Sequence, residues 1–154
     1  MRHAFGRKRA GSRAARSSSL RRSLGRALSR GILDTSVLIA DDVSPLLGEL
    51  AISVVSLAEL HFGVLLAVDD DARGRRLSRL SAMQRRFDPL PVDEAVAESY
   101  GLLAARVVKA ARQPRARVMD LLIAATAHAH EATLYTRNAE DLQCLEGVLQ
   151  VAVV

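Results

Sequence analysis

The stretch GILDTS at residues 31–36 decides the fold, because a short apolar run there ends in an acid that two hydroxyl residues follow. This order predicts a buried strand whose C-terminal end meets the start of a helix. A second apolar run at 51–55 precedes Ser56, which is expected to cap a helix with apolar residues out to Leu65. The pattern therefore predicts that strands and helices alternate along the chain.

The rest of the chain continues this alternation. Helices are predicted within 37–50 and at 72–87, 94–111 and 118–130, strands at 133–136 and 149–154, and a short edge strand at 89–92 that its two prolines limit. The strands are apolar on both faces, which indicates a parallel sheet covered by helices on either side. We predict a three-layer α/β/α sandwich with a central parallel sheet of about five strands.

Charge divides the chain into two parts. Residues 1–30 carry ten basic side chains and no acid, whereas residues 31–154 carry twelve basic and seventeen acidic ones. We predict that 1–30 is a basic, disordered N-terminal extension and that 31–154 is one folded domain, a length that suits a single core. Cys144 is the only cysteine and no apolar run reaches the roughly 20 residues of a membrane span, so we expect a cytoplasmic protein.

Four acids are predicted at positions that follow strands or begin helices: Asp34, Glu59, Asp120 and Asp141. Each also has a structural interpretation. Asp34 could cap a helix, and Glu59 could complete a capping box with Ser56. Asp120 could be stabilised by the dipole of the helix that it begins, and Asp141 could be a solvated loop acid. Ligands of parallel sheets bind beyond the carboxyl ends of the strands, and all four acids are expected at that edge.

Several carboxylates at one place repel one another unless a cation is present. Mg²⁺ prefers oxygen ligands, and no cysteine cluster suggests zinc. The four histidines do not have zinc-ligand spacing with the acids and are predicted to be surface or packing residues: His3, His61, His128 and His130. Carboxylate-held Mg²⁺ or Mn²⁺ can activate water for phosphodiester cleavage. Four arginines could then hold an RNA backbone, or simply belong to a solvated surface: Arg112, Arg115, Arg117 and Arg137.

Four stretches, taken in order, resemble the motifs of PIN-domain toxins of the VapC type: ILDTSVL at 32–38, SLAELHFG at 56–63, DLLIAATA at 120–127 and YTRNAEDL at 135–142. The resemblance spans about residues 31–154. It assigns the family's catalytic and metal-binding roles to the same four acids, and supporting polar roles to Thr136 and Asn138. Two features depart from the family: the extension at 1–30, and a segment at 41–45 that is shorter and more polar than usual.

The resemblance implies a PIN-like fold and a Mg²⁺- or Mn²⁺-dependent endoribonuclease that cleaves tRNA or rRNA. It also implies a homodimer and neutralisation by a small VapB-like antitoxin. Two other classes remain open. A phosphoryl-receiver domain would use acids such as Asp41 and Asp42, but it needs a lysine after a late strand, and Lys109 is predicted in a helix. An inactive PIN fold could act as a binding module for RNA or a partner.

Overall fold

The computed structural model describes residues 29–111 and 113–154. The extension predicted for 1–30 lies outside the described residues except for Ser29 and Arg30, and Arg30 already begins the first strand. Within the described ranges, no helix is both long and apolar enough to cross a membrane.

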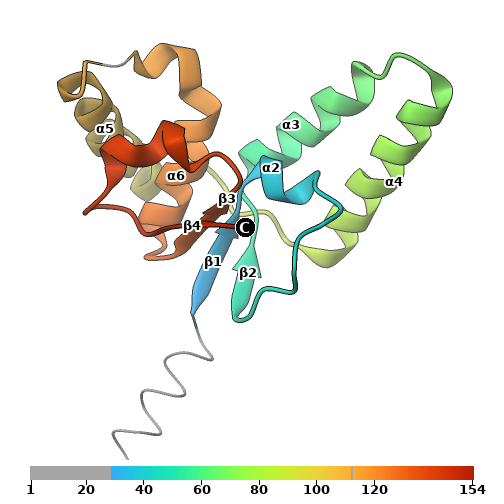
Figure 1. Cartoon of the computed structure of the whole chain (residues 1–154), viewed down its shortest axis with the longest axis horizontal. Helices are drawn as coiled ribbons and strands as arrows, with labels where there is room; N and C mark the ends of the chain where they lie inside the picture. Colours follow the sequence, from blue (N-terminus) through green and yellow to red (C-terminus); the bar gives the residue numbers. More distant parts are fainter. Residues whose placement is uncertain (1–28, 112) are drawn as a thin grey trace, which may run out of the picture.

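A four-stranded parallel sheet forms the centre of the molecule (Figure 1). Its strands are β1 (Arg30–Leu33), β2 (Glu49–Ala51), β3 (Thr133–Thr136) and β4 (Val151–Val153), in the spatial order β2-β1-β3-β4. All three pairings are parallel, so the carboxyl ends of the strands lie at one edge. The predicted α/β class and parallel sheet are confirmed.

The fifth strand predicted at 89–92 is reduced to a single parallel bridge between Ser53 and Leu90. Leu90 donates its N–H to the Ile52 carbonyl at 2.8 Å and accepts from the Val54 N–H at 2.9 Å. The residues on either side of Leu90 are prolines, which have no N–H to extend a ladder. The described residues therefore contain four strands rather than five.

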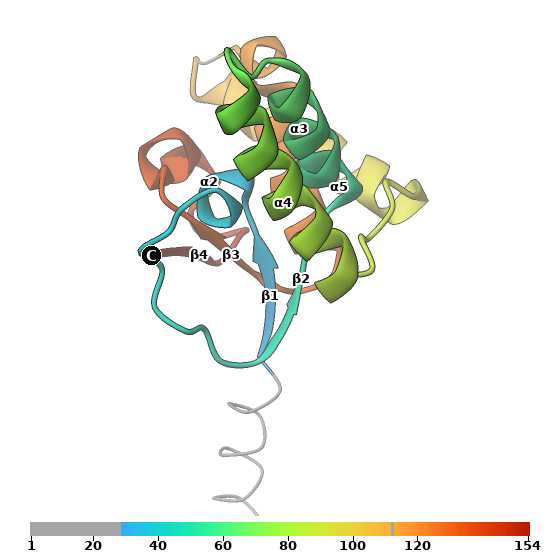
Figure 2. The same cartoon turned by 90° about the vertical axis from the view of Figure 1, so that its right-hand side faces the viewer.

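Helices cover both faces of the sheet. They are α2 (Thr35–Leu38), α3 (Val54–Leu65), α4 (Asp70–Arg86), α5 (Glu94–Lys109) and α6 (Val118–Ala129), with 3₁₀ segments η1 (Pro114–Arg117) and η2 (Ala139–Leu145). Successive residues of β1 enter separate cores: Ile32 packs in the cluster that contains residues of α5 and α6, and Leu33 in the one that contains residues of α2 and α4. Figure 2 places the α3–α4 hairpin nearest the viewer.

Two predicted secondary-structure elements in the N-terminal half of the chain are wrong. In place of the helix predicted within 37–50, the structure has the four-residue α2, which begins at Thr35 and ends at Leu38. The chain that follows contains Pro45 and a Gly48 with φ of +112°, neither of which favours a helix there. The strand predicted at 51–55 ends at Ala51, and α3 begins at Val54 with Ser53 as its cap. The Ser53 hydroxyl accepts the Val55 N–H at 3.2 Å, so Ser56 is not the cap.

Gly31 leaves room for the ring of Tyr135 against the sheet. A Cβ atom at Gly31 would lie 2.5 Å from Tyr135 Cε2 and 2.9 Å from Leu50 Cδ2. We expect Gly31→Ala to lower the free energy of unfolding by about 1–3 kcal/mol, the usual cost of overpacking. Gly74→Ala in α4, where a Cβ would meet nothing within 4 Å, should instead raise it by up to about 1 kcal/mol. Urea denaturation measures both, and equal effects would contradict the close approach at Gly31.

Candidate active site

Asp34 is the residue directly after β1, and its carboxylate is held by three donors. Oδ1 accepts the Thr35 N–H at 2.7 Å, and Oδ2 accepts the hydroxyls of Ser36 at 2.7 Å and Thr136 at 2.8 Å. Asp34 is also the N-cap of α2, so the structural interpretation of this acid holds as well. Three donors exceed what a cap needs, and they hold the carboxylate at the carboxyl edge of the sheet.

The hydroxyls that hold Asp34 are themselves positioned by the turn after β3. Thr136 is 1% exposed, and its Oγ1 accepts the Asn138 N–H at 3.1 Å. Ser36 Oγ accepts the Arg137 N–H at 3.0 Å. Thr136 thus contacts Asp34 directly, as its predicted supporting role requires, whereas Asn138 contributes its backbone to this network. Ser36 was not among the predicted site residues, although its place two residues after Asp34 is visible in the sequence.

Glu59 reaches the same edge from α3. Because α3 starts at Val54, Glu59 is its sixth residue and cannot form the predicted capping box with Ser56. Its Oε2 instead accepts the Thr35 hydroxyl at 2.5 Å. This bond joins Glu59 to the residue that follows Asp34, and it removes the main structural alternative for Glu59.

Asp120 lies in the first turn of α6. Burial raises its pKa, the negative charge of Asp34 adds to that rise, and the Arg117 guanidinium opposes it. Burial also raises the pKa of Glu59; the Thr35 hydrogen bond opposes this, while the charges of Asp120 and Asp34 add to it. The charge of Asp34 thus acts on both Glu59 and Asp120, and that of Asp120 acts on Glu59, which means that the fold brings these three acids together.

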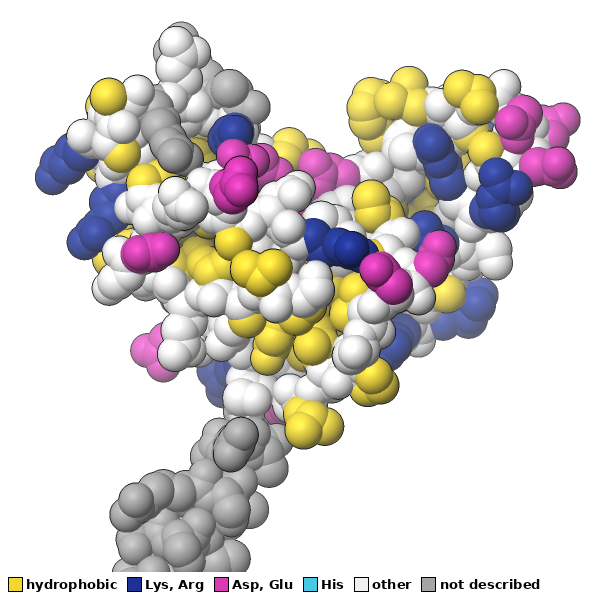
Figure 3. Space-filling view, in the orientation of Figure 1, with side chains coloured by type: hydrophobic (Ala, Val, Ile, Leu, Met, Phe, Trp, Pro, Cys, Tyr) yellow, Lys and Arg dark blue, Asp and Glu magenta, His cyan; other side chains and the backbone are white. Residues whose placement is uncertain are grey.

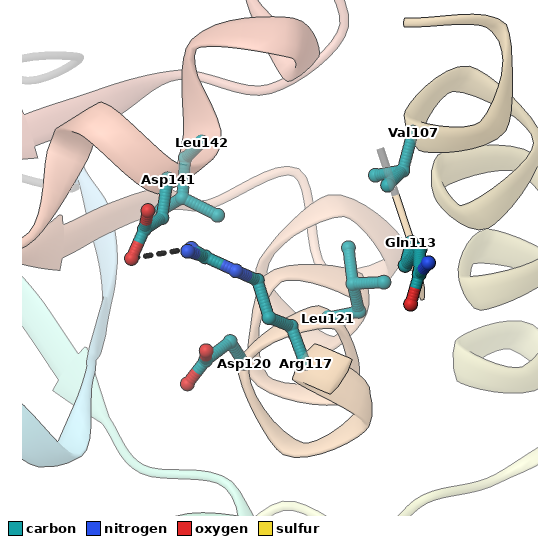
Figure 4. Close-up of a pocket in the computed structure, with 7 residues that line it drawn as sticks. All are labelled: Val107, Gln113, Arg117, Asp120, Leu121, Asp141 and Leu142. Carbon is teal, nitrogen blue, oxygen red and sulfur yellow. Dashed lines mark ion pairs between the residues drawn. The ribbon is translucent and has the colours of Figure 1, made fainter. Parts of the chain in front are cut away.

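Asp141 lies in η2 and forms an ion pair with Arg117. Figure 4 shows the Arg117 side chain extending past Asp120 toward Asp141. Asp34, Asp120 and Asp141 line one small cavity, together with Thr136 and Asn138 among others. Glu59 lines the adjoining hollow rather than this cavity.

Three hollows lie around the acids and are together called the groove below; the first two share Asp120, Asp141 and Leu142. The first hollow is lined by residues that include Val107, Arg117 and Asp120. The second is the small cavity lined by Asp34, Asp120 and Asp141. The third is lined by residues that include Thr35, Glu59 and Arg79. In the space-filling view, the surface is hollowed between the two helical lobes, and acidic side chains gather there (Figure 3). The acids thus lie in the middle of a groove.

The acids could hold a metal ion by their chemistry, since carboxylate and hydroxyl oxygens are hard ligands. Across residues 29–111 and 113–154, however, no three acidic, histidine or cysteine side chains stand at the spacing of a closed metal site. His128 Nδ1 lies 2.9 Å from the Ser99 hydroxyl, which confirms it as a packing residue. Any ion would therefore be held by a few carboxylates and water.

The predicted RNA-binding arginines are only partly described. Arg112 and the side chain of Arg115 lie outside the described part of the chain. Arg117 pairs with Asp141, and Arg137 pairs with Asp42. Arg76 and Arg79 of α4, which the sequence analysis does not single out, line the hollow that contains Glu59. The sequence signal was present, because arginines occupy one face of this amphipathic helix.

The receiver-domain alternative finds no support in this geometry. Asp41 and Asp42 form ion pairs with Arg79 and Arg137. Lys109 is the exposed last residue of α5. The acids at the sheet edge are Asp34, Glu59 and Asp120, and no lysine accompanies them in the residues that line the three hollows.

Residues 31–143 match the PIN domain family. The chain is 35% identical to Ribonuclease VapC5 of Mycobacterium tuberculosis over 130 residues, which is 80% of this chain and 93% of that protein. It is 41% identical to Ribonuclease VapC4 of the same organism over 115 residues, 71% of this chain and 86% of the relative. The range matched by the PIN domain family contains all four acids.

The fold agrees with these matches. The crystal structure of VapBC-5 from M. tuberculosis, a member of the VapBC family of toxin-antitoxin systems, superposes with a TM-score of 0.71 at 35% identity. The match covers 82% of this chain and 98% of the other. The chain therefore belongs to the PIN domain family. Within that family it is of the VapC type, which confirms the resemblance seen in the sequence.

The raised carboxyl pKa values predict a pH dependence of stability. Burial and the Asp34 charge raise the pKa of Asp120, so the folded chain binds this proton more tightly than the unfolded chain does. Stability from this group is therefore lost as pH rises from the ordinary range of an aspartate through the raised pKa. In chelator at pH 7, Asp120→Asn should raise the melting temperature and reduce its fall between acidic and neutral pH.

Asp88→Asn, at an exposed position outside the groove, is the matched control and should change neither quantity. Thermal unfolding followed by circular dichroism measures both variants. A lower melting temperature for Asp120→Asn at pH 7 would show that Asp120 is stabilised by its surroundings and would contradict the repulsion described above.

Proposed function

We propose that this chain is a Mg²⁺- or Mn²⁺-dependent endoribonuclease and the toxin of a toxin–antitoxin pair, with tRNA or rRNA as its substrate. The observation that carries the proposal is the convergence of Asp34, Glu59 and Asp120 at the carboxyl edge of the sheet, with Asp141 in the same groove. The two relatives named Ribonuclease VapC support the choice of RNA cleavage.

The donor set favours a hard divalent ion. Asp34 and Asp120 are the residues we propose as metal ligands, with Glu59 and Asp141 completing the acidic site. A cation would relieve the repulsion that contributes to the raised pKa values of Glu59 and Asp120. When bound, such an ion supplies an activated water and stabilises the leaving oxygen of a phosphodiester.

The chain's own residues perform the remaining tasks. The hydroxyls of Ser36 and Thr136 hold Asp34 in one orientation, which preorganises the acidic site. Thr35 orients Glu59 in the same way. Arg117 and Arg137 carry positive charge at the groove, where backbone phosphates of RNA would bind. Hydrolysis by water leaves a 5′-phosphate and a 3′-hydroxyl.

Protein partners are part of the proposal. The related solved structure is of a member of the VapBC family of toxin-antitoxin systems, which supports a VapB-like antitoxin as one partner. A second copy of the chain is the other partner that we propose. Large apolar side chains are exposed toward the turn that joins α3 and α4, among them Phe62 at 61%, Leu65 at 77% and Val68 at 90%. Exposed apolar surface of this kind suits protein contacts.

Asp34→Asn tests the proposed function. It keeps the size of the side chain but removes the charge at the centre of the acidic site, so RNA cleavage in Mg²⁺ or Mn²⁺ should fall by on the order of a hundredfold or more. Cleavage of total cellular RNA should show discrete cuts with 5′-phosphate ends, mapped by end sequencing, and should stop in chelator. Asp88→Asn should cleave like the unaltered chain.

Circular dichroism should show that Asp34→Asn remains folded. Full activity in that variant would refute the assignment of Asp34 to the site. A folded, unaltered chain that binds RNA and Mg²⁺ but cuts nothing would establish the binding module in place of the nuclease.

A further inference from the structure

Two neighbouring acids in the segment between α2 and β2 each bind an arginine from a different part of the fold. Asp41 pairs with Arg79 of α4, and Asp42 pairs with Arg137 in the turn after β3. The second pair has two contacts, one of them 3.3 Å from Arg137 Nη2 to Asp42 Oδ2. Figure 3 shows dark blue and magenta side chains side by side on this face, next to the hollow.

Both arginines belong to the rim of the acidic site. The Arg137 N–H donates to Ser36 Oγ at 3.0 Å, and Ser36 in turn donates to Asp34. Arg79 lines the same hollow as Thr35 and Glu59. The main chain of Arg137 thus contacts a residue that holds Asp34, and the Arg79 side chain lines the hollow that contains Glu59, so both arginines are near the acidic site.

The two ion pairs are exposed to water and therefore exchangeable. The Asp41 side chain is 89% exposed and that of Asp42 is 71% exposed. Exposed ion pairs contribute little to stability, so a stronger ligand can replace them. A phosphate accepts the same two-contact geometry from an arginine that a carboxylate does. The hydrogen bond and charge of Arg137 lower the pKa of Asp42, so the acid remains ionised at neutral pH.

The segment that carries these acids, residues 39–48, joins α2 to β2. The acids are consecutive, and they pair with arginines from two separate parts of the fold, α4 and the turn after β3. Two adjacent negative charges that hold two arginines resemble adjacent backbone phosphates in their chemistry.

We propose that Asp41 and Asp42 compete with RNA for Arg79 and Arg137, and that these two arginines bind backbone phosphates once RNA displaces the acids. This inference rests on the proposed RNA substrate. The acidic pair lowers affinity for RNA in general, so that only an RNA with further contacts in the groove displaces it. Asp41 and Asp42 are therefore specificity-determining residues that do not touch the scissile bond.

The test is RNA binding by the full chain in chelator, where cleavage does not interfere. The probe is a labelled single-stranded oligouridylate, and fluorescence anisotropy reports its binding at several salt concentrations. The double variant Asp41→Asn/Asp42→Asn should bind several-fold more tightly than the unaltered chain at low salt. The slope of the logarithm of its binding constant against the logarithm of the salt concentration should be steeper by about 1.4. Each additional phosphate contact on a single strand adds about 0.7 to that slope.

The matched control is Asp88→Asn/Glu146→Gln, which changes the net charge by the same amount at exposed positions outside the groove. Equal gains in both double variants would reduce the effect to net charge and overturn the proposal. Adding Arg79→Gln and Arg137→Gln to the Asp41→Asn/Asp42→Asn variant should abolish the gain, and persistence of the gain would also overturn it.

The outcomes separate this proposal from the proposed function. If the unaltered chain cleaves RNA but the Asp41→Asn/Asp42→Asn variant binds the probe no more tightly, the competition is refuted and the nuclease stands. If that variant binds more tightly but no chain cleaves RNA, the competition stands and the nuclease fails. The single variant Asp42→Asn, which removes only the two-contact pair, provides a second measurement if the double variant does not fold.

Discussion

The parallel pairing of β1 with β3 is the constraint on which the site depends. Beyond the last paired residues, the Asp34 N–H donates to the Tyr135 carbonyl at 2.9 Å, which places the Asp34 carboxylate beside the hydroxyl of Thr136. Three donors then hold one negative charge at the sheet edge. Glu59 is tied to the same place through Thr35, and the charge of Asp34 helps to raise the pKa of Asp120.

Three arginines around the groove form ion pairs with acids of the same chain. Arg117 pairs with Asp141, Arg137 with Asp42 and Arg79 with Asp41, so each of these arginines at the acids has an acidic partner. Of these arginines, Arg117 also opposes the rise in the pKa of Asp120. The three ion pairs also mean that an anionic substrate gains access to the arginines only by replacing carboxylates, which makes binding sensitive to salt.

The local order of apolar and polar residues predicted the limits of β3 and α6 well. The strand at 133–136 has the predicted limits, and α6 ends within a residue of its predicted end. The run at 51–55 was misassigned because its β-branched residues favour a strand, whereas Ser53 caps a helix and Val55 packs into the core from that helix. The predicted capping box at Glu59 failed for the same reason.

The sequence by itself determined the alternation of apolar strands and helices, and hence the edge at which Asp34, Glu59, Asp120 and Asp141 would meet. That information is local, since each acid follows a strand or starts a helix within a few residues. Only the tertiary structure decided which arginines and acids pair. Asp41 and Arg79 are 38 residues apart and Asp42 and Arg137 are 95 apart, so no local periodicity relates them. Long side chains meet only after the sheet and the α3–α4 hairpin have been assembled.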